Sequence, residues 1–217
     1  MRIKKVSLNS IENYNCVNAE MEYEYYLYNK NQCSDRIKYL ITLKYVYNNL
    51  STDKQKEVIS FIFSKKRSQQ ECSYILNINE SSVTRRKQCF IKNCEKILFF
   101  IDTFYRFILS DSESIDTDFE KILLAHKNHR IFLTKKQKNQ LLFFSNLLDK
   151  DNKMQIFNDY YIFDKKMDEL AIENNVHICN ISRNLKKRSR MVLEIINIYN
   201  YTLYYLEKGI NINEIFN

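Results

Sequence analysis

Apolar residues recur at helical spacing along most of the chain, and short polar breaks separate these stripes from one another. The first stripe begins at about Arg36, where apolar side chains return every three or four residues, as on one face of an α-helix. It comprises Ile37, Leu40, Ile41, Leu43, Tyr45 and Tyr47. The polar residues from Asn48 to Asp53 that follow are of the kind that start a helix, so a second helix is expected after them.

Two segments lie outside these stripes. Residues 1–34 are polar and rich in tyrosine, with acids at Glu20, Glu22 and Glu24, and we expect a partly helical lead-in there. The stretch 110–118 is acidic and rich in serine, which is typical of a linker. The sequence therefore predicts a polar lead-in over 1–34, a first domain over 35–109, an acidic linker over 110–120 and a second domain over 121–217.

Turn-forming residues are almost absent, since the 217 residues include one glycine and no proline. Folds rich in strands need such residues in number, so their scarcity favours helices joined by short polar loops. An AT-rich genome would produce the same composition and reduces the weight of this observation. Together with the helical spacing, it predicts an all-α fold.

The two halves of the chain resemble each other when they are offset by 98 residues, which aligns 57–101 with 155–199 without a gap. The apolar positions match better than the identities do. The notable identities are Glu71 with Glu169, Asn77 with Asn175, Arg85 with Arg183, and Ile97 with Ile195. We therefore expect a duplicated helical unit.

The first repeat contains the residue types that a tight turn between two crossing helices needs. Ser73 is small enough for a second helix to cross closely, and Asn77 tolerates the left-handed backbone that ends a helix. Ile78 would fill the corner, Asn79 would cap the next helix, and Val83 would pack back against the first helix. This spacing predicts a helix-turn-helix.

The second repeat has the same order of residue types. Ala171 is the small residue, Asn175 the turn residue and Val176 the corner residue. His177 occupies the cap position and Ile181 the packing position. The sequence therefore predicts a second helix-turn-helix, in tandem with the first.

Both segments resemble the E-[IL]-A-x-x-L-[GN]-[IV]-S-x-x-[TS]-V-x-R pattern of region 4 of bacterial RNA polymerase sigma factors. The resemblance extends over 50–100 and 148–200, roughly half of the chain, and includes the helices expected before each turn. Asn174 departs from the pattern, because the first repeat has the apolar Leu76 at that position. The resemblance implies two bundles in which the helix after the turn, near 80–90 and 178–190, contacts promoter DNA.

Basic residues follow each turn, where they could contact phosphate, and the first residues of each helix could reach base edges. In the first unit the expected DNA-binding residues are Glu80, Ser81, Ser82, Thr84, Arg85, Arg86 and Lys87. In the second unit they are Asn180, Ser182, Arg183, Lys186, Lys187, Arg188 and Arg190, with Ile178, Cys179 and Asn184 also at groove-facing positions. The second set begins with fewer hydrogen-bonding groups, so we expect it to contact phosphate more than bases. A solvated helix face is the alternative interpretation.

Charge points to the same kind of partner. Lys and Arg total 34 against 26 acids, a formal net charge of +8 that favours a polyanion. The expected partners are double-stranded DNA first and RNA polymerase core second. Both helices after the turns continue into apolar stripes, which we interpret as core, with a homodimer or polymerase-facing surface as the alternative. The acidic linker should not touch DNA.

Several kinds of chemistry are not expected. The six cysteines form no C-x-x-C pair, and no apolar run approaches the roughly 18 residues of a membrane span. No secretory signal begins the chain, so reduced thiols and a cytoplasmic location are expected. His126 and His129 lack partners at metal-binding spacing, and a single glycine cannot form a phosphate loop. We expect no metal, no cofactor and no enzymatic activity.

Four functions remain open at this point, and the least specific of them is a helical structural protein whose motifs are fortuitous. A sigma factor also needs a region 2, and only about 34 to 50 residues precede the first unit. The chain could be a divergent sigma factor of a low-GC bacterium or its phage, or an activator built from two region 4-like units. The alternative from another class is an interaction module that binds polymerase or a sigma factor without DNA affinity of its own.

Overall fold

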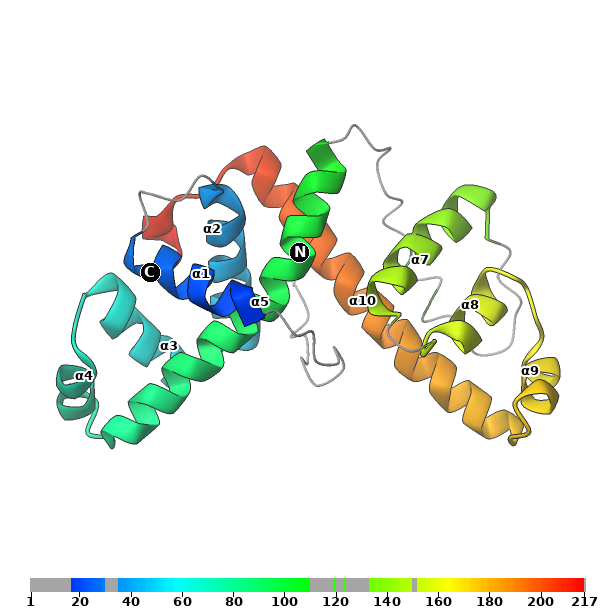
Figure 1. The fold of residues 1–217 in the computed structure, drawn as a ribbon, viewed down its shortest axis with the longest axis horizontal. Helices are drawn as coiled ribbons and strands as arrows, with labels where there is room; N and C mark the ends of the chain where they lie inside the picture. Colours follow the sequence, from blue (N-terminus) through cyan, green and yellow to red (C-terminus); the bar gives the residue numbers. More distant parts are fainter. Residues whose placement is uncertain are drawn as a thin grey trace. The chain divides into compact units, whose positions relative to one another are not determined.

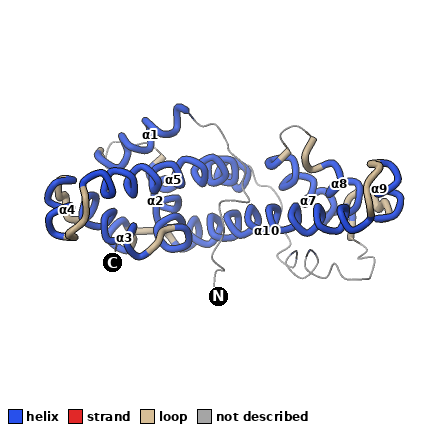
Figure 2. Tube along the Cα trace, turned by 90° about the horizontal axis from the view of Figure 1, so that it is seen from below, coloured by secondary structure: helices blue, strands red, loops and turns tan. Residues whose placement is uncertain are grey.

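The computed structural model describes residues 17–29, 35–109, 119, 123, 133–149 and 152–216. These residues form helices and connecting loops without a strand, which confirms the all-α class (Figure 1, Figure 2). Contacts between Cα atoms divide the chain into two compact units. Unit 1 includes Glu12–Ser112 and Ile198–Asn217, and unit 2 includes Glu113–Asn197.

In unit 1, four helices pack along the long helix α5, whose bounds are Glu80–Leu109 (Figure 1). They are α1 (Val17–Tyr28), α2 (Arg36–Tyr45), α3 (Asp53–Ile59) and α4 (Gln69–Ile75). A π-helical turn extends α2 over Val46–Leu50 (η2), and another extends α3 over Ser60–Ser64 (η3). The α2 start at Arg36 agrees with the apolar stripe of the sequence.

Local chemistry explains where these helices begin. The Thr52 side chain accepts a hydrogen bond from the Gln55 backbone N–H, which caps the start of α3 in the expected polar break. Ser68 and Glu71 form a reciprocal capping box at the start of α4, with N···O distances of 2.8 and 3.1 Å. These caps satisfy N–H groups that the helices themselves leave free.

Part of the lead-in belongs to unit 1. The tyrosines of α1 pack against α2, where the rings of Tyr26 and Tyr39 stack with their centroids 4.5 Å apart. The Tyr23 hydroxyl donates to the Tyr39 carbonyl oxygen at 3.2 Å, deep in the core. The tyrosine-rich composition of the lead-in thus has a packing role.

The C-terminal end of the chain also belongs to unit 1, whereas the sequence placed all of 121–217 in the second domain. Helix α10 spans Ile178–Lys208 and passes from unit 2 into unit 1 at Ile198. Two edge-to-face aromatic pairs hold its last turns in the unit 1 core: Tyr45 with Tyr201 at 4.9 Å and Phe104 with Tyr199 at 5.3 Å. A 3₁₀ turn, η4 (Ile212–Glu214), follows.

In unit 2, three helices gather beside the first part of α10 in both views (Figure 1, Figure 2). They are α7 (Lys135–Leu148), α8 (Gln155–Tyr161) and α9 (Met167–Glu173). Helix α7 starts with a second capping box, formed by Thr134 and Gln137. The Tyr161 and Ser189 hydroxyls lie 3.2 Å apart and join α8 to α10 in the core.

The apolar stripes of the two long helices are buried, which confirms that they form core. In α5 the buried residues include Phe90, Ile91, Cys94, Ile97, Leu98, Ile101 and Phe104. In α10 they include Val192, Ile195, Ile196 and Tyr199. Most of the proposed linker, 110–118, lies outside the described residues, as do His126 and His129.

Candidate nucleic-acid interface

The duplication inferred from the sequence has a close counterpart in helix positions. Helices α4 and α9 begin at Gln69 and Met167, and α5 and α10 begin at Glu80 and Ile178. Both pairs of starting residues are 98 positions apart, which is the offset at which the two halves align. Each half therefore has a short helix, a four-residue connection and a long helix in the same register.

The turn between α4 and α5 is closed by hydrogen bonds on both sides of Asn77. Asn77 has a φ of 48°, which confirms the left-handed conformation expected for it. The Ile78 N–H donates to the Ser73 carbonyl oxygen at 3.1 Å. The Ser73 hydroxyl donates to the Ile78 carbonyl oxygen at 2.6 Å, so the small residue both permits and locks the turn.

The turn between α9 and α10 repeats this backbone geometry with other side chains. Asn175 has a φ of 51°, and the Val176 N–H donates to the Ala171 carbonyl oxygen at 3.0 Å. Asn174, which departs from the family pattern, donates from Nδ2 to the Leu170 carbonyl oxygen at 2.8 Å. Its amide therefore adds a second hydrogen bond to a carbonyl that already accepts from the Asn174 N–H at 3.1 Å, in place of the apolar contact expected there.

The His177 side chain caps α10. Its Nδ1 accepts a hydrogen bond from the Cys179 backbone N–H at 3.2 Å, so the imidazole takes the part expected of a polar cap residue. The packing residues also behave as expected, because Val83 and Ile181 are both buried. The two corner residues differ from each other, because Ile78 is half-buried whereas Val176 is exposed. The expectation that Val176 fills the corner is wrong.

A second pair of residues with a left-handed backbone was not predicted from the sequence. Lys66 and Asp164 have φ values of 52° and 56°, and they too lie 98 positions apart. In each unit the next backbone N–H, of Arg67 or Lys165, donates 2.9 Å back into the preceding helix. Aspartate tolerates this conformation but lysine is not a turn signal, so only the repeat alignment could have paired the two positions.

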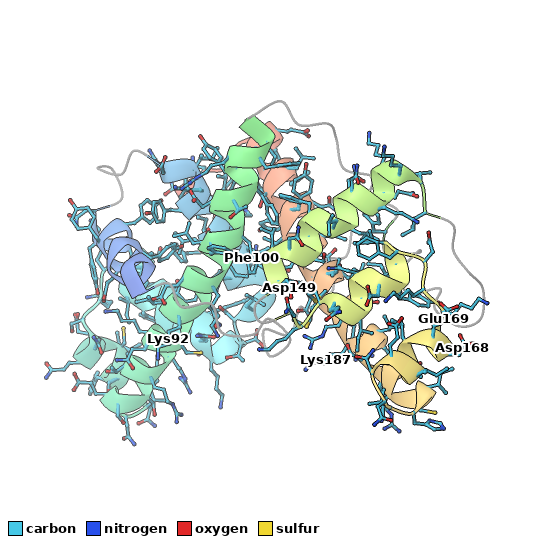
Figure 3. The ribbon with its side chains drawn as sticks, turned by 45° about the vertical axis from the view of Figure 1, so that its right-hand side comes forward. Lys92, Phe100, Asp149, Asp168, Glu169 and Lys187 are labelled. Carbon is cyan, nitrogen blue, oxygen red and sulfur yellow. The ribbon has the colours of Figure 1, made fainter. Side chains whose placement is uncertain are left out.

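The groove-facing positions of α5 divide into open and engaged side chains. Glu80, Ser81 and Arg85 are exposed, whereas Ser82, Thr84 and Arg86 are half-buried. The Thr84 hydroxyl donates to Gln69 Oε1 at 2.6 Å, which ties α4 to α5. Further along α5, Lys92 is exposed (Figure 3).

Lys87, an expected DNA-binding residue, lies on the buried side of α5, so we remove it from the expected DNA-binding set. Its Nζ is 2.8 Å from Glu24 Oε1 and 2.9 Å from the Tyr28 hydroxyl oxygen, both on α1. Burial acts to lower the pKa of Lys87, but the bonds to Glu24 and Tyr28 outweigh it and raise that pKa. The only feature of the sequence that pointed to a partner for Lys87 was the acidic cluster of the lead-in, to which Glu24 belongs.

In α10 most of the expected residues are exposed, namely Asn180, Ser182, Arg183, Lys186, Lys187 and Arg190. Lys187 is labelled on α10 in Figure 3, with Asp168 and Glu169 on α9. Arg188 differs, since it is half-buried and its Nη1 donates to Met191 Sδ at 3.6 Å. We therefore assign Arg188 to the packing of unit 2 and not to its exposed basic face.

The exposed face of α10 is strongly cationic. The sequence has no acidic residue from Ile178 to Leu193, a stretch that carries five basic ones. Two of the three acids of the preceding helix are engaged locally: Glu169 accepts from the Lys166 N–H at 2.9 Å, and Glu173 pairs with Lys165 at 2.8 Å, whereas Asp168 is exposed. Arg183, Lys186 and Arg190 are exposed on this face, where they can attract a polyanion.

No protein-family model, curated protein or solved structure that was compared with the chain matches it. Within the described ranges, no group of three or more His, Cys, Asp or Glu side chains is arranged to hold a metal ion. None of the helices in the described part of the chain combines the length and apolar character that a membrane crossing requires.

Proposed function

We propose that the chain is a sequence-specific DNA-binding transcription regulator, similar to sigma factor region 4, that contacts promoter DNA through the starts of α5 and α10. The observation that carries this proposal is the repeated register. At a spacing of 98 residues, a left-handed asparagine precedes a long helix that presents an exposed arginine at the same position, Arg85 or Arg183. A short helix, a tight turn and a basic second helix form the arrangement that helix-turn-helix proteins insert into the major groove.

The two starts differ in the chemistry they would offer to DNA. The α5 start presents Glu80, Ser81 and Arg85, which can donate or accept hydrogen bonds at base edges. The α10 start is followed by Arg183, Lys186 and Arg190, which supply the phosphate attraction common to all DNA. The two units would therefore contribute unequally to sequence reading and to affinity.

Fluorescence anisotropy with labelled random-sequence duplexes tests the proposal. We expect the full chain to bind at low salt and the Arg85→Ala/Arg183→Ala double variant to bind at least tenfold more weakly. Lys54→Ala/Lys208→Ala is a charge-matched control, because it removes two exposed positive charges away from the two turns. Absence of binding by the wild-type chain, or equal affinity of the double variant, would overturn the proposal.

A second candidate is an interaction module that binds RNA polymerase core or a sigma factor. It is favoured by Tyr74 and Ile172, which occupy equivalent repeat positions and are 89% and 81% exposed. Large apolar side chains so open to solvent are typical of protein-contact sites. Binding of purified polymerase core, lost on Tyr74→Ser/Ile172→Ser and accompanied by no DNA affinity, would favour this candidate over the first.

A further inference from the structure

The start of α10 has an apolar edge formed by Val176, Ile178 and Cys179. The Val176 and Ile178 side chains are 40% and 41% exposed, and Cys179, a small hydrophobic residue, is exposed as well. Ile178 is the first residue of α10, and Val176 lies in the turn just before it. Apolar groups thus stand where a helix entering the major groove makes its base contacts.

Two of the three equivalent positions of unit 1 have different chemistry, while the third, Ile78, is apolar like Val176. Glu80 and Ser81, at the start of α5, correspond to Ile178 and Cys179 in the repeat alignment. Both residues of unit 1 are polar and exposed. The duplication therefore keeps the backbone of the turn but replaces hydrogen-bonding side chains by apolar ones at the leading positions of the second helix.

The charge around the apolar edge limits what it can contact. Arg183 lies one turn beyond Cys179 on the same face of α10, and Lys186 and Arg190 continue that exposed face. A partner that fits must present apolar groups beside dense negative charge. In the major groove of DNA the thymine C5-methyl is the one apolar group on the base edges, and phosphates flank it on both sides.

We propose that the apolar edge of α10 reads thymine methyl groups in the major groove, so that the second unit selects thymine-rich sequence by apolar contact. This inference rests on the proposed DNA-binding function. It replaces the expectation that the second unit contacts mainly phosphate, because methyl recognition requires no hydrogen-bonding side chain. Unit 1 would read polar base edges, and unit 2 would read methyl groups while its basic residues hold the backbone.

Uracil substitution isolates the methyl group. Sites selected by the full chain from random-sequence DNA are resynthesised with uracil in place of thymine, which removes only the C5-methyl and keeps the pairing and the O4 acceptor. We expect the wild-type chain to bind the uracil duplex about fourfold more weakly for each methyl contacted, the factor that corresponds to one buried methylene-sized group.

Ile178→Ala locates the contact. This variant is expected to bind the thymine duplex more weakly and to lose most of the difference between thymine and uracil. Phe163→Ala is the matched control, since it also removes an exposed apolar side chain of unit 2 but lies outside the apolar edge. It should keep the wild-type difference.

The outcomes separate the inference from the function on which it rests. If the wild-type chain binds no DNA, the proposed function fails and this inference fails with it. If it binds thymine and uracil duplexes equally, or if Ile178→Ala keeps the full difference, methyl reading by the apolar edge is overturned while DNA binding stands.

Discussion

Asn77 and Asn175 adopt the same left-handed backbone conformation, with φ values of 48° and 51°, at positions 98 residues apart in the chain. In each case the next residue donates its N–H to the carbonyl oxygen of a small residue, Ser73 or Ala171, within 3.1 Å. The left-handed region is costly for most residues but cheap for asparagine and glycine. The two turns therefore share one backbone conformation and one backbone hydrogen bond, although the side chains around them differ.

Replacement of the turn asparagines tests the role of this shared conformation. Asn77→Gly should keep or slightly raise stability, whereas Asn77→Ala should lower the free energy of unfolding by about 1 kcal/mol, because alanine is strained at positive φ. Urea unfolding followed by circular dichroism measures the difference. Asn146→Ala, at an exposed position inside α7, is the control and should not destabilise. Equal stability of the Asn77→Gly and Asn77→Ala variants would show that alanine is not strained in this turn.

The ion pair between Lys87 and Glu24 should matter for folding and not for DNA. Glu24→Gln leaves the buried ammonium without its opposite charge, and we expect a loss of about 1 kcal/mol, moderated because Glu24 is partly open to solvent. Lys87→Met removes the charge and keeps the apolar stem, so its DNA affinity should stay within about twofold of wild type. A loss of affinity as large as that of Arg85→Ala would return Lys87 to the DNA-binding set.

The raised pKa of Lys87 fixes the sign of a pH effect. The pKa of Lys87 is higher in the folded chain than in the unfolded chain, where it is roughly 10.4. The charged Lys87 therefore stabilises the fold fully at any pH below this unfolded pKa. That contribution is lost as the pH rises through the pKa of the folded chain. The stability difference between the wild-type chain and Lys87→Met should therefore be constant from neutral pH to about pH 10 and shrink above it. Urea midpoints measured across this range provide the comparison.

The capping box of α4 should weaken in acid. The backbone N–H of Ser68, its hydroxyl and then Arg67 hold the pKa of Glu71 below its ordinary value. A carboxylate whose pKa is lowered by folding stabilises the fold fully at pH values above its unfolded pKa of about 4.3. This contribution is lost as the pH falls through the pKa of the folded chain. A carbon-detected NMR titration should place the Glu71 midpoint below that of an unfolded peptide. Glu71→Gln should reduce the acid sensitivity of α4, and an unshifted midpoint would contradict the geometry.

The exposed and half-buried arginines of α10 provide a matched pair for salt dependence. Arg183→Ala and Lys186→Ala should each lower the slope of log affinity against log salt by about 0.9, the effect of one lost phosphate contact. Arg188→Ala should leave the slope unchanged and lower the stability of unit 2, since that side chain packs toward Met191. Anisotropy titrations from about 50 to about 200 mM salt resolve these slopes. A slope change for Arg188→Ala as large as that for Arg183→Ala would reverse the assignment.

Local features of the fold could be predicted because they depend on neighbouring residues. The helix start at Arg36, the cap at Thr52 and the turns at Asn77 and Asn175 each follow from side chains within four positions. The α4–α5 and α9–α10 connections were also predictable as a pair, because a repeat reveals a shared register even where few residues are identical.

Features that join distant segments could not be predicted. Lys87 looks like its basic neighbours in the sequence, and only the packing of α1, 63 positions earlier, buries it beside Glu24. Arg188 is different, because helical periodicity could have separated it from its basic neighbours: it lies seven positions after the buried Ile181, whereas Arg183 and Lys187 face solvent. Val176 matches the corner position by type, but the fold leaves it exposed.

The sequence by itself determined the helical class, the duplicated register and the two left-handed turns, because each depends on periodicity or on residues a few positions apart. Only the tertiary structure decided which basic residues remain open to a partner. It also decided that the last turns of α10 complete the core of unit 1 through Tyr199 and Tyr201. The physical reason is that burial and charge pairing are properties of contacts between remote segments, and one-dimensional patterns do not specify those contacts.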